Sequence, residues 1–249
     1  MDDARKKWLA ERRCSIGGSD AAAAICCSRW ATRLDVWSDK ALGVTRPRTP
    51  DAEHAMMIGH LLEDDVAELY SRETGRRLVP GSWDGLGIVR STEHPFMHAT
   101  IDYHIIAEQR DGEPFEDYAK RARVAVLQCK TTSARNARHW RQQPPIEAQI
   151  QLQHELAVTG YAWGSLACLA GTWEFFREDY ERHERFIALM VELERELWGY
   201  VERCEEPDPM QGGASRQGLT QAFGVQTTLD GCCDVIERVN EELAKEATV

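Results

Sequence analysis

Apolar residues recur along the chain at two spacings, which separate the predicted helices from the predicted strands. Leu62, Val66 and Tyr70 fall on one helical face, which predicts a single helix over residues 51–74. Helical patterns also cover residues 20–27, 147–158 and 179–203, and extended patterns cover residues 77–80, 86–90, 98–106, 122–129, 163–170 and 172–177. Helices on both sides of a strand cluster predict an α/β fold with a central mixed β-sheet flanked by helices.

The chain divides by composition into three parts. Residues 1–209 form one alternating α/β stretch, whose length suits a single domain. Residues 210–228 are rich in Gly, Gln, Ser and Thr and are predicted to be a linker. Residues 229–249 are predicted to be a C-terminal helical appendage, because Val235 and Val239 recur at a helical spacing.

The chain lacks the sequence features of membrane insertion or export. No apolar run approaches the roughly 20 residues that span a bilayer, and the charged start MDDARKKWLAERR has no apolar signal core. The eight cysteines include no Cys-x-x-Cys spacing, so free thiols are expected rather than a zinc site. These observations predict a cytoplasmic protein.

Charge is unevenly distributed along the chain. With 41 acidic and 30 basic residues the formal net charge is -11, which excludes a highly basic protein that coats DNA nonspecifically. From Tyr118 through Ile146, however, no acid occurs, and this stretch carries Arg135, Arg138 and Trp140. A local groove that follows a phosphate backbone is therefore compatible with the acidic total, and a basic solvated helix explains the stretch equally well.

The segment ARVAVLQCK offers the first candidate chemistry. Side chains alternate across a strand, so Gln128 and Lys130 point to the same face. If this strand pairs with the stretch that carries Asp102, an acid, an amide oxygen and a lysine meet at one end of the sheet. Such a set suits Mg²⁺-dependent phosphodiester cleavage, with Glu63 as a second carboxylate. The spacing alone favours a plain strand that ends in a solvated lysine.

The segment RRCSIGGSD offers a second candidate. Its two glycines allow a ligand to approach the backbone, and Ser19 is predicted to be the N-cap of the following helix. The helix N-terminus and a bidentate contact from Arg12 or Arg13 suit a phosphate group. A turn followed by an ordinary N-cap is the simpler interpretation of this segment alone.

Together these segments resemble the phage lambda-type alkaline exonucleases, the YqaJ-like viral recombinase group of the PD-(D/E)xK nucleases. The resemblance covers about residues 8–209. Its motifs follow the family's order, namely RRCSIGGSD, WSDK, GHLLEDDVAELY, HPFMHATID, LQCKT, QLQHELAVTG and a late proline at Pro207. It implies a restriction-endonuclease-like core.

The resemblance assigns a role to each candidate residue. It implies that Asp102 binds the metal, that Lys130 is the catalytic lysine and that Glu63 lies near a second metal position. It matches Gln151 to a glutamine on the helix after the catalytic strand, and it makes the main-chain carbonyl of Cys129 a metal ligand.

The resemblance also implies a substrate and partners. Arg12, Ser19 and Thr100 fall where the family binds the 5′-phosphate of a DNA end. The implied enzyme is a Mg²⁺-dependent 5′→3′ exonuclease, with Mn²⁺ as a substitute, acting on linear double-stranded DNA. It leaves 3′ single strands for recombination, forms a homotrimer and works with a single-strand annealing protein. The implied setting is a bacterial cell that carries the gene on a phage or prophage.

Gln128 departs from the family pattern, which has a glutamate at this position. The lost charge is worth up to roughly 4 kcal/mol at 4 Å from another charge. Three interpretations stay open: Glu63 or another acid compensates, the chain is a catalytically weak or dead DNA-end-binding relative, or the residue is an engineered inactivating change. An iron–sulfur nuclease is disfavoured, because Cys204, Cys232 and Cys233 lack the spacing of a cluster.

Overall fold

The computed structural model describes residues 3–84, 87–108, 111, 113–114, 117, 122–207 and 228–246. Its helices are α1 (Asp3–Arg13), α2 (Gly18–Ala24), α3 (Arg33–Leu42), α4 (Pro50–Leu61), α5 (Glu63–Thr74), α7 (Ala137–Gln142), α8 (Ile146–Thr159), α9 (Glu184–Arg203) and α11 (Leu229–Glu246). Its strands are β1 (Ile16–Gly17), β2 (Arg77–Pro80), β3 (Ile88–Arg90), β4 (Met97–Thr100), β5 (Tyr103–Ile106), β6 (Arg123–Thr132), β7 (Trp163–Ala170) and β8 (Glu174–Glu181). Two 3-10 turns are η1 (Gly81–Asp84) and η2 (Ala134–Asn136). None of the helices described is apolar over a length that could cross a bilayer.

The strands form two mixed sheets. The larger sheet has the order β2-β5-β6-β7-β8, in which β6 and β7 run parallel and the other neighbours run antiparallel. The smaller sheet has the order β1-β4-β3, with β1 parallel and β3 antiparallel to β4. The expected α/β fold with mixed strands and flanking helices is confirmed, although the strands divide between two sheets.

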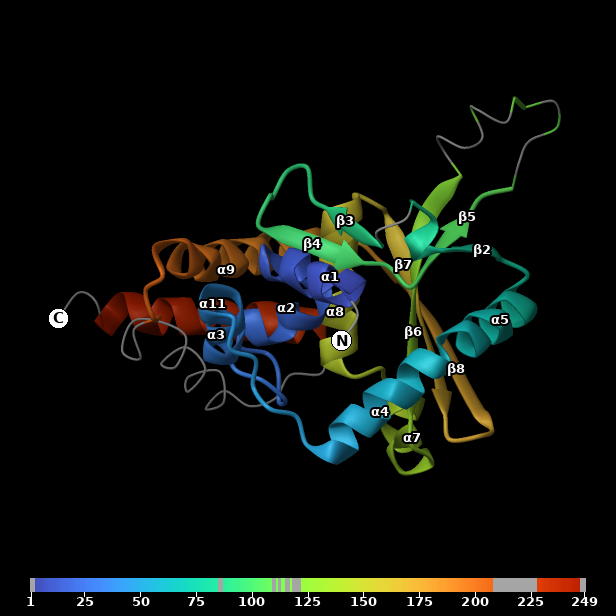
Figure 1. Ribbon diagram of the computed structural model, residues 1–249, viewed down its shortest axis with the longest axis horizontal. Coiled ribbons are helices and arrows are strands. Elements are labelled where there is room, and N and C mark those ends of the chain that lie inside the picture. The colour runs from blue at the N-terminus through green and yellow to red at the C-terminus, as the bar shows by residue number, and fades with distance from the viewer. Residues whose placement is uncertain are drawn as a thin grey trace.

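Strand β6 lies between two helical layers. Because side chains alternate along a strand, Val126 packs in the cluster that contains Leu152 and Leu156 of α8, whereas Leu127 packs with Tyr70 of α5. Figure 1 shows α2, α3, α9 and α11 gathered on the side of α8, with α5 on the opposite side of β6 and α4 crossing the lower part of this strand. The last residues of β6 are therefore enclosed by helices of both layers.

Two predicted helices have different limits in the structure. The helix expected over 51–74 is broken at Leu62, where φ is -96° and ψ is 0°, and this break makes Glu63 the first residue of α5. No glycine or proline marks the break in the sequence. The helix expected over 179–203 begins only at Glu184, because β8 continues its pairing with β7 as far as Glu181.

The extended stretch predicted over 98–106 is also divided. Strand β4 joins the smaller sheet and β5 joins the larger one, and Ile101 and Asp102 form the connection between them. The chain therefore changes sheets at the aspartate, which places this carboxylate at the junction of the two sheets.

Helix α11 packs into the main core. Its residues Leu229, Cys232 and Ile236 are buried in the cluster that includes α8 and α9. The linker predicted over 210–228 lies outside the described residues except for its last residue, and the three-part domain division stays a prediction.

Candidate active site

The β5–β6 pairing brings Asp102 to the end of β6. Tyr103 is in register with Leu127, and the Cys129 amide donates a 2.8 Å hydrogen bond to Asp102 Oδ2. The Gly81 amide donates to the Asp102 carbonyl at 2.9 Å, and a Cβ on Gly81 would lie 1.7 Å from the Ile101 oxygen. Only glycine at position 81 allows η1 to come this close to Ile101. Asp102 is therefore held by a hydrogen bond from η1 and by another from β6.

A chain of hydrogen bonds links the other face of β6 to α8. Lys130 Nζ donates to Gln151 Oε1 at 3.0 Å, and Gln151 Nε2 donates to Glu155 Oε1 at 3.0 Å. Gln128 Nε2 donates to the same Glu155 oxygen at 3.3 Å. The predicted common face of Gln128 and Lys130 is confirmed by these contacts, because both side chains reach the same helix.

Three carboxylates around this strand end hold their protons more tightly than free acids do. Burial, followed by the charge of Asp102, raises the pKa of Glu155 to about 8. The same two causes raise the pKa of Glu63. Burial raises the pKa of Asp102, although Lys130 acts in the opposite direction. The negative charges of neighbouring carboxylates repel each other, and a bound cation would relieve this repulsion. The raised pKa values therefore indicate a candidate cation site.

The donor atoms fit a hard divalent cation. Gln128 Oε1 is buried and has no hydrogen-bond partner among the described residues, and the next residue, Cys129, donates its amide to the Asp102 carboxylate. Mg²⁺ binds through one or two carboxylates and keeps water and phosphate oxygens as its other ligands. In the described part of the chain, no group of three or more His, Cys, Asp or Glu side chains forms a metal cage. Burial also raises the pKa of the Cys129 thiol, which disfavours a thiolate ligand at this residue.

The segment before α2 differs from its prediction in one respect. Gly17, not Ser19, is the N-cap, and its amide donates to Asp20 Oδ2 at 3.1 Å. Ser19 is therefore exposed within the first turn, and its hydroxyl accepts a 2.9 Å hydrogen bond from Arg12 Nη2. Arg12 also stacks on Trp8, with the guanidinium carbon 4.7 Å from the ring centre. The structure thus brings Arg12 and Ser19 together through their side chains.

This arginine–serine pair lies next to the hydrogen-bond chain on α8. A Cβ on Gly18 would lie 3.1 Å from Gln151 Cγ and 3.3 Å from Glu155 Oε1, so α2 and α8 are in close contact. Thr100 ends the neighbouring strand β4, and its hydroxyl is buried without a hydrogen-bond partner among the described residues. These contacts place an arginine, two hydroxyls and the candidate metal ligands within one region.

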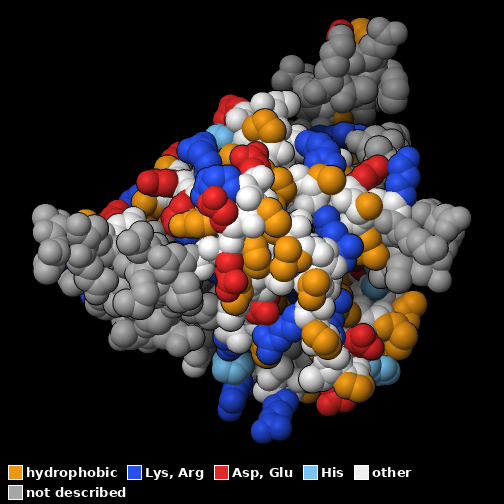
Figure 2. All heavy atoms as spheres, turned by 60° about the vertical axis from the view of Figure 1, so that its left-hand side comes forward, with side chains coloured by type: hydrophobic (Ala, Val, Ile, Leu, Met, Phe, Trp, Pro, Cys, Tyr) orange, Lys and Arg blue, Asp and Glu red, His pale blue; other side chains and the backbone are white. Residues whose placement is uncertain are grey.

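The basic residues after β6 are only partly free to bind DNA. Arg135 and Arg138 are exposed on η2 and α7, beyond the strand end that carries Lys130. Trp140 is buried, and Arg141 pairs with Glu174 at 2.6 Å, so neither extends the patch. On the face shown in Figure 2, basic and acidic side chains are interspersed. Arg135 and Arg138 are the exposed cations nearest in sequence to the site.

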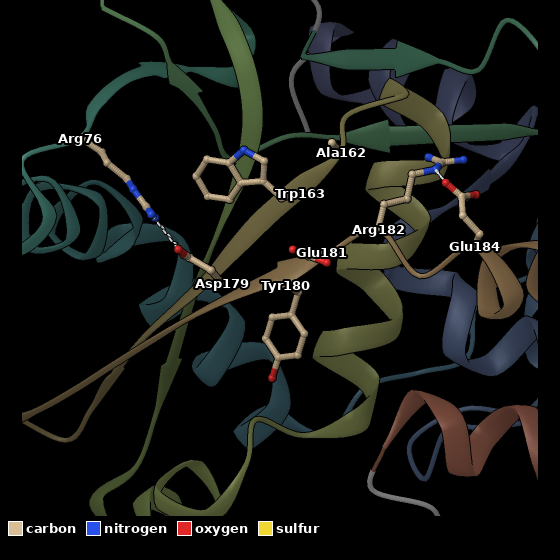
Figure 3. A pocket seen from close by; sticks show the side chains of 8 residues that line it. All are labelled: Arg76, Ala162, Trp163, Asp179, Tyr180, Glu181, Arg182 and Glu184. Atoms are coloured by element: carbon tan, nitrogen blue, oxygen red, sulfur yellow. Dashed lines mark hydrogen bonds and ion pairs between the residues drawn. The ribbon is translucent and has the colours of Figure 1, made fainter.

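A separate surface pocket of about 620 Å³ lies against β7 and β8. Two ion pairs lie in it, Arg76 with Asp179 at 2.7 Å and Arg182 with Glu184 at 2.8 Å, and Glu181 adds a third acid (Figure 3). Trp163 stacks on the Arg76 guanidinium at 4.6 Å. The two ion pairs and the Trp163–Arg76 contact are packing interactions beside the edge strand β8.

Glu155 is the site residue that the sequence patterns did not identify. It is 2% exposed and stands between Leu152 and Leu156, which belong to the core. An acid at a core-facing position of a helix was the signal available in QLQHELAVTG, since such positions rarely hold an unpaired charge.

Comparisons with known proteins identify the family of this chain. Residues 7–162 match the family of YqaJ-like viral recombinase domains. An uncharacterised protein YqaJ of Bacillus subtilis strain 168 is 33% identical over 197 residues, which cover 78% of this chain and 55% of that protein. The chain thus spans about half the length of this relative.

The fold is similar to that of solved alkaline exonucleases. The alkaline exonuclease LHK-Exo of Laribacter hongkongensis matches with a TM-score of 0.58 and 16% identity, covering 80% of this chain and 93% of that one. Its complex with dAMP matches with a TM-score of 0.56 and 17% identity, covering 80% and 95%. At this identity the likeness establishes the fold alone, an α/β core with a mixed sheet as in these alkaline exonucleases.

Proposed function

The chain belongs to the family of YqaJ-like viral recombinase domains, and we propose that it is a metal-dependent deoxyribonuclease that degrades linear double-stranded DNA from 5′-phosphorylated ends. One observation carries the proposal: Lys130 is held by Gln151 on the strand end where Asp102 is fixed by the Cys129 amide. A lysine beside a fixed carboxylate suits metal-assisted hydrolysis of a phosphodiester, in which the carboxylate holds the cation and the lysine orients the attacking water.

Mg²⁺, or Mn²⁺ in its place, would be held by Asp102, Glu63, Gln128 Oε1 and the Cys129 carbonyl. When bound, the cation supplies a positive charge that polarises the scissile phosphate. Lys130 orients the attacking water, and the hydrogen bond to Gln151 keeps its ammonium group on the α8 side of the strand. The chain thus contributes the cation ligands and a lysine positioned to donate a hydrogen bond to the attacking water.

The 5′-phosphate would bind to Arg12, Ser19 and Thr100. The Arg12–Ser19 hydrogen bond presents two donors together, and the unpartnered Thr100 hydroxyl supplies a third. Because α2 contacts α8 directly, an anchored 5′ end would lie beside the cleavage site. Arg135 and Arg138 would contact the phosphate backbone beyond it.

Digestion from the 5′ end leaves a 3′ single strand, which a single-strand annealing protein would take up for recombination. The complex of LHK-Exo with dAMP supports a deoxynucleoside monophosphate as the product. The family's description as viral recombinases supports a phage or prophage gene. The homotrimer around the DNA and activity in the bacterial cytoplasm are proposed from the family resemblance alone.

Digestion of end-labelled duplexes tests this function. Linear DNA labelled at either the 5′ or the 3′ end should release label first from the 5′ end, and closed circular DNA should stay intact. A 5′-hydroxyl end should be digested more slowly than a 5′-phosphate end. Cleavage of circular DNA, or release of the 3′ label first, would contradict the proposed polarity and end requirement.

A second candidate function is DNA-end binding without cleavage. The observation in its favour is Gln128, which places no negative charge at the strand position that normally carries an acid. A band-shift assay with product analysis separates the candidates. Retarded linear DNA that stays intact in Mg²⁺ and in Mn²⁺ would favour the binding function.

A further inference from the structure

Gln128 stands on β6 beside Asp102, at the position where the family pattern has a glutamate. Gln128 is 1% exposed, and its Nε2 donates to Glu155. Because only the amide nitrogen can donate to a carboxylate, this contact turns Oε1 away from α8. That oxygen is buried and lacks a hydrogen-bond partner among the described residues. The strand therefore offers a neutral oxygen where the family pattern has an anionic one.

A carboxylate lies one hydrogen bond away, on the neighbouring helix. The Glu155 oxygen that accepts from Gln128 at 3.3 Å also accepts from Gln151 at 3.0 Å, so two amides fix its position. Gly18 of α2 closes the space behind it, since a Cβ there would lie 3.3 Å from the same oxygen. The negative charge is displaced from the strand to the helix by roughly the length of one hydrogen bond.

The buried Glu155 carboxylate is held by two amide hydrogen bonds but by no direct ion pair among the described residues. It is 2% exposed, and within the described ranges it forms no ion pair, because the nearby Lys130 donates to Gln151 instead. A buried carboxylate without a cation is costly, and a neutral residue would accept the same two amide hydrogen bonds at lower cost. A structural role alone does not explain an acid at this position.

We propose that Glu155 replaces the missing strand glutamate and supplies the carboxylate charge for the divalent-cation site of Asp102. With Glu155 in place of the strand glutamate, the number of acids in the site is unchanged. The hydrogen bond from Gln128 to Glu155 links strand β6 to helix α8. This inference rests on the proposed nuclease function, because it assigns a charge to the metal site of that activity. It also removes the reason to regard Gln128 as inactivating.

Calorimetric titration of Mn²⁺ into the full chain, with and without 5′-phosphorylated duplex, tests the assignment. Glu155→Gln should weaken Mn²⁺ binding by about 10- to 100-fold. Glu147→Gln is the matched control, because this acid lies in the first turn of the same helix and pairs with Arg29 instead. It should bind Mn²⁺ as the unaltered chain does.

The double variant Gln128→Glu/Glu155→Gln returns the acid to the strand. It should regain most of the lost Mn²⁺ affinity and the digestion of linear duplex DNA. Circular dichroism shows whether Glu155→Gln folds. If it does not fold, the double variant alone tests the assignment. A folded double variant that binds Mn²⁺ as the unaltered chain does supports the assignment, and a folded double variant that binds Mn²⁺ weakly overturns it.

The outcomes separate this inference from the nuclease proposal. If Glu155→Gln binds Mn²⁺ as tightly as the unaltered chain and still digests DNA, the role of Glu155 is wrong while the nuclease function stands. If the unaltered chain neither binds Mn²⁺ nor digests DNA, both proposals fail.

Discussion

Replacing Glu155 by glutamine in the metal-free protein is expected to stabilise the fold, and the gain should grow with pH. Burial and the charge of Asp102 raise the pKa of Glu155 from its ordinary value of 4.5 to about 8. Between these values the unfolded chain has released the proton that the native state still binds. The native state is therefore progressively destabilised as pH rises through this range, and glutamine removes the effect.

The size of the gain follows from the pKa shift. One pKa unit corresponds to about 1.4 kcal/mol, so the cost of Glu155 approaches about 5 kcal/mol above pH 8. It is about 3 kcal/mol at pH 7 and about 1 kcal/mol at pH 5, and it vanishes below pH 4. These values are upper limits, because water entry and relaxation reduce the cost of burying a charge.

Guanidinium unfolding in a chelator at pH 5, 7 and 8.5 measures this gain as a difference in free energy of unfolding. Glu147→Gln serves as the control of opposite sign. Although burial opposes it, the hydrogen bond from Arg29 lowers the pKa of Glu147, so losing this acid should destabilise the protein above pH 4. A Glu155→Gln protein less stable than the unaltered chain at every pH, or a gain that does not rise with pH, would refute the reasoning.

Three further substitutions test other parts of the site. Asp102→Asn should abolish Mn²⁺ binding and DNA digestion while preserving the fold, because the Asn oxygen still accepts from the backbone amide; unchanged Mn²⁺ affinity by calorimetry would remove this residue from the metal site. Arg12→Ala should lower the ratio of digestion rates on 5′-phosphate and 5′-hydroxyl duplexes towards one, and an unchanged ratio would argue against an end-binding arginine. Gly18→Ala should cost about 1–3 kcal/mol in denaturant unfolding, because its Cβ meets Gln151 and Glu155; a variant as stable and active as the parent would show that α2 and α8 can separate.

Most of the site could be predicted because strand alternation and pairing act over short distances. The two-residue spacing of Gln128 and Lys130 fixed their common face, and the pairing of β5 with β6 delivered Asp102 to the same strand end. The family resemblance points to Gln151 as a site residue. In the structure its amide accepts a hydrogen bond from Lys130 and donates one to Glu155.

The features that the sequence did not reveal depend on tertiary contacts. The break at Leu62 has no local signal, yet it is what places Glu63 at the start of α5. The true N-cap is Gly17, whose amide is bound by the Asp20 carboxylate, while the Ser19 hydroxyl is bound by Arg12. Glu155 was missed because a helix pattern reports which face is buried but not which strand covers it.

The central claim is that this chain cleaves DNA with a divalent cation and Lys130. The most direct test follows the digestion of a 5′-phosphorylated linear duplex in Mg²⁺, by the unaltered chain and by Lys130→Ala, with a chelator as the blank. The unaltered chain should shorten the duplex in Mg²⁺ and not in the chelator. Lys130→Ala should leave the duplex intact, although that variant should still retard the DNA. Equal digestion by both proteins, or digestion that persists in the chelator, would contradict the claim.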